Sequence, residues 1–113
     1  MSRDYRLHID DILASIEKIR EYTAGMTYEK FASDSKTQDA VVRNLEIIGE
    51  AAKALPEDMR ARASGTDWRK IIGLRNVLIH EYFGVSLPII WDVVANKLDG
   101  LASACGEVLE ESG

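Results

Sequence analysis

The sequence predicts an all-α protein, an antiparallel four-helix bundle with one or two additional short helices. Apolar residues recur at intervals of three and four along four long stretches, which places them on one face of a helix. No stretch shows the alternation of apolar and polar residues that is typical of a strand. The connections between the stretches are short, which favours antiparallel neighbours. With 113 residues, the chain is expected to form a single domain over residues 1–113.

The first half of the chain predicts two long helices with a short turn between them. The first covers residues 4–23, and its apolar face is made by Ile9, Ile12, Leu13, Ile16 and Ile19. One helical turn is expected around Tyr28–Phe31. Ser35 and Gln38 fit the capping box, in which both side chains satisfy free backbone N–H groups, and predict a second helix from about Thr37 to Leu55.

The second half predicts a short helix, a central helix and a long last helix. Pro56 to Ala63 is the short one, because proline suits a first helical turn. Thr66 or Asp67 caps the central helix, which is expected to run from Trp68 to about Tyr82. Ser86 is expected to cap a single last helix that reaches the C-terminus, with an apolar stripe of Leu87, Trp91, Val94, Leu98, Leu101, Cys105, Val108 and Leu109.

Composition excludes several classes of function. The net charge of −5 gives no global basic field of the kind that general nucleic-acid binders use, although a few arginines can still form a local phosphate site. The one cysteine, Cys105, allows no internal disulfide and no metal site built on cysteines, and its place in an apolar stripe predicts a core residue. The charged N-terminus is unlike a signal peptide, and no run has the length of a membrane span, so a cytoplasmic protein is expected.

The central stretch is an apolar helix that also contains polar residues, which are unusual in a helix of this kind. Arg75, His80 and Tyr82 stand among isoleucines, leucines and valine, and burying them without partners costs desolvation energy. On a regular helix, Arg75 and Tyr82 lie roughly 20° apart and Arg75 and His80 about 140° apart. Either His80 therefore lies in a distorted last turn, or two copies of the helix meet at a dimer interface and form one composite cleft.

A histidine and an arginine without a carboxylate cluster suit metal-free cleavage of RNA, with no cofactor. Histidine exchanges protons near neutral pH, and arginine holds phosphate through a two-pronged donor array. The plain structural alternative is that Arg75 pairs with Glu81 or another carboxylate, that His80 is a helix C-terminal cation and that Tyr82 packs in the core. The second helix is likewise expected to have an exposed charged edge beside its apolar stripe, formed by Arg43, Glu46 and Glu50.

The stretch DWRKIIGLRNVLIHEYF resembles the signature of HepT-like proteins in the HEPN superfamily. These are small, helical, dimeric proteins with an Arg-x4-His-x-Tyr motif, which Arg75, His80 and Tyr82 match at every defined position. Residues 41–56, VVRNLEIIGEAAKALP, are similar to the family's second helix. The resemblance covers essentially the whole chain.

The resemblance implies the toxin of a type VII, HepT/MntA toxin–antitoxin system. Such toxins are metal-independent ribonucleases, and Arg75 and His80 would be the catalytic pair. The partner would be an MntA-like nucleotidyltransferase antitoxin that transfers AMP onto Tyr82. The added negative phosphate beside the arginine and histidine would then block the RNA phosphate. Asn76 and Arg43 are weaker candidates for contacts to the RNA backbone.

Two other functions stay open at this level. The chain can be a non-catalytic helical module that binds a nucleotide or substrate and docks on a minimal nucleotidyltransferase. It can also be a purely structural helical dimer. The apolar stripes are wide for a bundle this small, so all three readings include a homodimer that buries a shared face.

Overall fold

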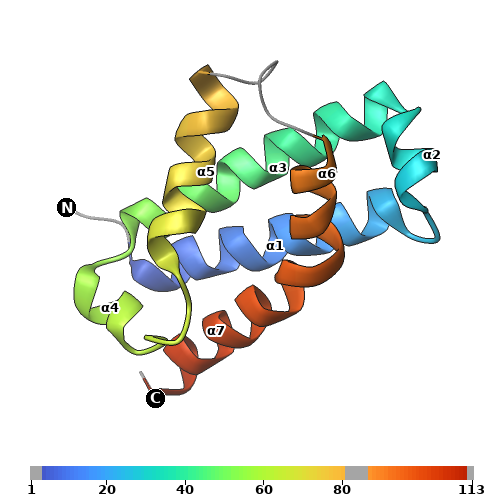
Figure 1. Ribbon diagram of the computed structural model, residues 1–113. Helices are drawn as coiled ribbons and strands as arrows, with labels where there is room; N and C mark the ends of the chain where they lie inside the picture. Colours follow the sequence, from blue (N-terminus) through green and yellow to red (C-terminus); the bar gives the residue numbers. More distant parts are fainter. Residues whose placement is uncertain (1–3, 81–86, 112–113) are drawn as a thin grey trace.

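The structure is a computed structural model that describes residues 4–80 and 87–111 (Figure 1). The side chains of Val77, Ile79, His80 and Glu111 also lie outside the description. Four longer helices are present: α1 (Tyr5–Thr23), α3 (Ser35–Ala54), α5 (Trp68–His80) and α7 (Leu98–Glu111). Shorter segments connect them, namely α2 (Tyr28–Ala32), α4 (Glu57–Ala61), α6 (Leu87–Asp92) and the π-helix η2 (Val93–Lys97). These ranges contain no strand, which confirms the all-α prediction.

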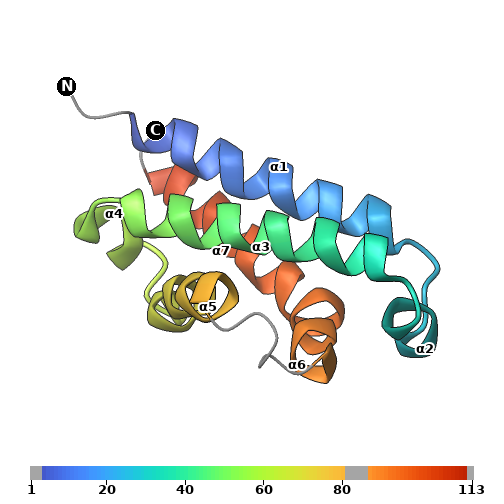
Figure 2. The same ribbon diagram turned by 90° about the horizontal axis from the view of Figure 1, so that it is seen from above.

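The core lies between α1, α3 and α7, which run alongside one another (Figures 1 and 2). The apolar stripes predicted from the sequence face this core. Its fully buried side chains include Ile9, Ile12, Ile16 and Ile19 of α1, Val41 and Ala52 of α3, and Cys105 and Val108 of α7. Phe31 of α2 and Trp91 of α6 close one end, with ring centroids 5.2 Å apart. None of the described helices combines the length and hydrophobicity of a membrane span.

The prediction of a capping box at the start of the second helix is wrong. Asp34 is the N-cap instead, and its carboxylate accepts hydrogen bonds from the Thr37 backbone N–H (3.1 Å) and hydroxyl (2.7 Å). Ser35 is already inside α3, and the Gln38 amide donates to the carbonyls of Phe31 and Ala32. A charged carboxylate is a stronger acceptor for free N–H groups than a serine hydroxyl, so Asp34 takes the cap position one residue before Ser35, and the helix starts at Ser35.

The single last helix predicted from the sequence is divided into three segments. After α6, the turn from Val93 to Lys97 is a π-helix, and α7 continues from Leu98. The Asn96 amide donates to the Asp92 carboxylate (2.7 Å) across this turn. Ser86, the predicted cap of this helix, lies outside the described residues. The π-helix inserts about one extra residue per turn, which shifts the apolar stripe of α7 relative to that of α6.

The short α4 and the start of α5 are fixed together by Trp68. Its indole N–H, in a buried side chain, donates to the carbonyls of Arg60 (3.0 Å) and Ala63 (3.2 Å). The Asp67 carboxylate accepts from the backbone N–H of Lys70 (3.2 Å), so Asp67 caps α5, as one of the two predicted alternatives. From this anchored start, α5 crosses α3 steeply and packs mainly on it (Figures 1 and 2).

Candidate active site

Arg75 lies where α5 crosses α3, and it is held from both helices. Its side chain is 24% exposed, and one terminal nitrogen (Nη2) lies 3.5 Å from Glu50 Oε1 of α3. The other terminal nitrogen (Nη1) donates to the Asn76 side-chain oxygen of its own helix at 3.3 Å. Arg75 therefore pairs with a carboxylate, as the structural alternative expected, but the carboxylate comes from another helix.

Gly49 allows the two helices to meet at this point. It is buried in α3, and a Cβ added there would collide with the Cβ of Arg75 and come within 3.2 Å of the Ile71 carbonyl oxygen. Only a residue without a side chain fits between the backbones at this separation. The consecutive pair Gly49 and Glu50 therefore places both the backbone and the guanidinium of Arg75.

The guanidinium still has an unused donor. Its Nε is buried and has no hydrogen-bond partner among the described residues. A buried N–H without a partner costs about 1–3 kcal/mol, and such groups are usually paired unless a ligand completes them. Because the Nε itself is buried, a phosphate would be held through the terminal nitrogens of this half-buried, oriented arginine.

The other two residues of the predicted triad are not placed by the structure. Helix α5 ends at His80, but the His80 side chain lies outside the description, as do Tyr82 and Glu81. Both arrangements considered from the sequence, a distorted last turn and a composite cleft between two copies, stay predictions. Asn76 is next to Arg75 and accepts a hydrogen bond from it, and its contact to RNA stays a prediction.

Arg43 lies on the same face of α3 as Glu50, two turns earlier in the helix, which corresponds to about 10.5 Å along its axis. It is exposed, and it pairs with Glu46 at 3.5 Å. The predicted exposed edge is thus confirmed for Arg43 and Glu50, whereas Glu46 is half-buried. The sequence analysis did not predict the ion pair between Glu50 and Arg75 of α5.

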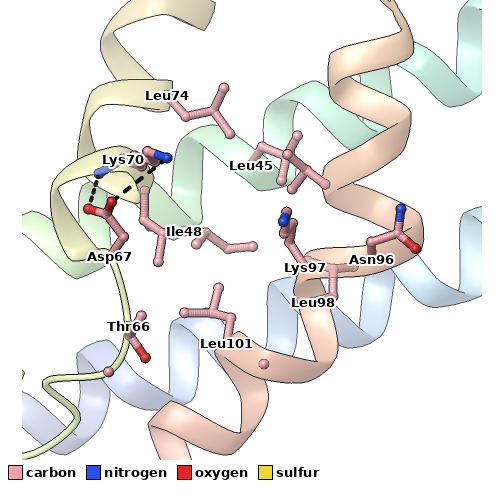
Figure 3. Close-up of a pocket in the computed structure, with 14 residues that line it drawn as sticks. Leu45, Ile48, Thr66, Asp67, Lys70, Leu74, Asn96, Lys97, Leu98 and Leu101 are labelled. Atoms are coloured by element: carbon pink, nitrogen blue, oxygen red, sulfur yellow. Dashed lines mark hydrogen bonds and ion pairs between the residues drawn. The ribbon is translucent and has the colours of Figure 1, made fainter.

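An apolar groove of about 460 Å³ lies beside this site, between α3 and α5 on one side and η2 and α7 on the other (Figure 3). Its walls include Leu45, Ile48, Leu74, Leu98 and Leu101. Lys70 and Lys97 also line it, from opposite walls, and Lys70 approaches Asp67 at 4.0 Å. The groove exists because one side of α5 packs on α3, while the other side of α5 is left uncovered within the described residues.

The chain is similar in sequence to proteins named as ribonucleases. The family model "Ribonuclease HepT-like" matches residues 12–108. A protein of Methanocaldococcus jannaschii named "Putative RNase MJ0127" is 41% identical over 109 residues, covering 96% of this chain and 90% of that protein. "Probable ribonuclease HepT" of Thermococcus cleftensis is 41% identical over 101 residues, covering 89% of this chain and 92% of that protein. No solved structure matches the chain significantly.

The matched region contains α3, α5 and Arg75, so the residues that build the site lie inside the family region. The resemblance seen in the sequence is confirmed, and so is the prediction of a ribonuclease at the level of the family. This chain belongs to the HepT-like ribonuclease family.

Proposed function

We propose that the protein is the toxin of a type VII toxin–antitoxin system, a metal-independent endoribonuclease that acts in the cytoplasm. Its catalytic pair is Arg75 and His80. The observation that carries this proposal is the oriented guanidinium of Arg75, held by Glu50 and Asn76 five residues before His80 in a ribonuclease-family chain. Among the described residues, no cluster of three or more metal-ligating side chains lies near it.

The proposed reaction uses the RNA's own 2′-hydroxyl as nucleophile. His80 moves a proton, either from the 2′-hydroxyl as it attacks phosphorus or to the 5′-oxygen as it leaves. The bond from phosphorus to the 5′-oxygen breaks, and a 2′,3′-cyclic phosphate forms. Arg75 stabilises the negative charge that builds on the phosphate oxygens. Asn76 and Arg43 contact the RNA backbone, the latter two helical turns away along α3.

The same site offers a simple mode of control. We propose that an MntA-like nucleotidyltransferase antitoxin transfers AMP to the hydroxyl of Tyr82, with release of pyrophosphate from ATP. The added phosphodiester carries a negative charge close in sequence to His80 and Arg75. It would compete with the RNA phosphate for the guanidinium and block the cleft sterically.

We further propose that two copies of the chain form a homodimer across α5. The uncovered side of this helix and the apolar groove beside it support the proposal, because apolar surface of this kind is commonly buried against a partner. In such a dimer, the arginine of one copy and the histidine of the other can share a cleft.

The decisive experiment is induced expression without the antitoxin, with the wild type beside His80→Ala. Growth and the integrity of cellular RNA are followed in parallel. The expected result is that only the wild type arrests growth and fragments RNA. A second assay tests the proposed chemistry with purified protein, an RNA oligonucleotide and its all-deoxy counterpart, both in excess EDTA. The expected result is that the RNA is cut and the DNA is not.

A different outcome favours the non-catalytic alternative, for which the apolar groove with two lysines on its walls is the relevant observation. If RNA stays intact with the wild type at high concentration and the protein still binds nucleotide or the nucleotidyltransferase tightly, the chain is a binding module. Equal toxicity of the wild type and His80→Ala would also remove His80 from the mechanism.

A further inference from the structure

We infer that Glu50 is the positioning residue for Arg75 in RNA cleavage, an inference that rests on the proposed function. Among the described residues, Glu50 is the only one outside α5 that forms an ion pair with the guanidinium, through its Oε1 at 3.5 Å from Nη2. The sequence alone gave no sign of this role, since the two residues are 25 positions apart on different helices.

The backbone fixes only the base of the Arg75 side chain. Gly49 sets the position of its Cα and Cβ against α3, but three rotatable bonds separate the Cβ from the guanidinium. Asn76 restrains Nη1, and being in the same helix it moves with Arg75. Glu50 restrains Nη2 from α3, so the two contacts together fix the guanidinium plane relative to both helices.

The pair is unsuited to a role in stability. Glu50 is 59% exposed, and an ion pair this exposed contributes little to folding because solvent screens it. At 3.5 Å, the contact is also longer than a strong charge-assisted hydrogen bond. The carboxylate therefore orients the guanidinium while leaving it free to bind a phosphate.

This geometry predicts opposite effects on turnover and binding. Glu50→Gln removes the charge that holds Nη2, so the guanidinium samples other positions and kcat falls. It also removes a negative charge that repels the RNA phosphate, so KM stays unchanged or decreases. We expect kcat to fall roughly tenfold, which corresponds to about 1.4 kcal/mol of lost transition-state stabilisation. A merely structural residue would not separate kcat from KM in this way.

The test compares wild type, Glu50→Gln, Arg75→Lys and the double variant, with Glu17→Gln as the matched control. Glu17 is an exposed glutamate of α1 that pairs with Arg20 at 2.8 Å, so the control removes the same kind of charge away from the site. If Glu50 acts through Arg75, Glu50→Gln changes kcat less than about twofold in the Arg75→Lys background. Additive losses in the double variant, or equal losses in Glu17→Gln, overturn the inference.

A spectroscopic readout separates this inference from the proposed function. The ¹⁵N Nε–H resonance of Arg75, assigned by its loss in Arg75→Lys, is expected to shift and exchange faster with water in Glu50→Gln, and to stay unchanged in Glu17→Gln. If the wild type cuts no RNA, the proposed function fails, and the resonance still reports whether Glu50 holds the guanidinium. An unchanged resonance in Glu50→Gln overturns the inference even if RNA is cut.

Discussion

At the scale of single residues, the proposed site depends on the shape of one guanidinium. Arg75 donates a hydrogen bond from Nη1 to Asn76 and forms an ion pair through Nη2 with Glu50, and its Nε is buried. A lysine keeps the charge but has one donor group and no planar fork, so it cannot make these contacts and also hold a phosphate. We expect Arg75→Lys to lower kcat on the order of a hundredfold while the fold is kept.

The measurement is the initial rate of cleavage of an RNA oligonucleotide, with helix content followed by circular dichroism. Arg20→Lys is the control, because Arg20 is also ion-paired to a glutamate but lies on α1. Full activity of Arg75→Lys would show that only the positive charge matters at this position, and the orienting contacts would lose their proposed purpose.

Cys105 illustrates a residue whose sequence interpretation can be tested at the same scale. Its side chain is fully buried among core residues, and burial raises the pKa of the thiol to about 12. The reactive thiolate is therefore almost absent at neutral pH. We expect no labelling by iodoacetamide in the folded protein and complete labelling in urea, measured by mass spectrometry. Rapid labelling of the folded protein would contradict the buried placement of this core residue.

At the scale of elements, the junction of α3 and α5 is the feature that builds the site. Gly49→Ala places a methyl group against the Cβ of Arg75, and this contact is between backbone-near atoms that cannot rotate away. The helices must separate, so we expect a loss of about 1–3 kcal/mol in the free energy of unfolding. Cleavage should fall by more than the unfolded fraction explains, because Arg75 moves with α5.

The matched control is Gly106→Ala in α7, where an added Cβ meets nothing within 4 Å. Replacing glycine by alanine within a helix there is expected to stabilise the protein by about 0.5–1 kcal/mol. Urea unfolding of both variants beside the wild type checks the pair. If Gly49→Ala is as stable and active as the wild type, the helices do not approach as closely as described.

The start of α3 gives a prediction about pH. The hydrogen bond from the Thr37 hydroxyl, followed by the one from its backbone N–H, lowers the pKa of Asp34 below the ordinary 3.8. Because the folded-state pKa is depressed, this cap stabilises the fold above the unfolded pKa, and its contribution is lost as pH falls through the folded pKa. Asp34→Ala should lower the urea midpoint at neutral pH. The difference from the wild type should shrink well below pH 3.8. A constant difference would assign the effect to something other than the charged cap.

The same elements show how far the sequence alone could reach. The long helices followed from apolar spacing, and the Asp67 cap followed from residue type, because both are local properties. The contact between Glu50 and Arg75 depends on how two helices cross, which no local pattern states. The π-helix at Val93–Lys97 was missed because one inserted residue leaves the apolar spacing of each flanking segment intact. Tyr82 lies outside the described residues, so its role stays a prediction.

At the scale of the whole molecule, the described structure leaves one side of α5 and the groove beside it uncovered (Figures 2 and 3). A homodimer that buries this face predicts that Leu74→Glu, which puts a charge on the groove wall, yields a folded monomer. Light scattering coupled to size-exclusion chromatography measures the mass, and circular dichroism checks the fold. A dimer of unchanged stability in Leu74→Glu would place the interface elsewhere on the surface.

Whether the active site is shared between copies can be decided by complementation. Arg75→Ala and His80→Ala are each expected to be inactive as homodimers. If the arginine of one copy works with the histidine of the other, a mixed dimer of the two variants has one complete site and one that lacks both residues. Random mixing by co-expression should then restore about a quarter of the wild-type rate, because half of the dimers are mixed and each has one of two sites. If both residues act within one copy, every site in the mixture lacks one of them and no activity returns. The first outcome supports a composite cleft, and the second places His80 beside Arg75 through a distorted last turn of α5.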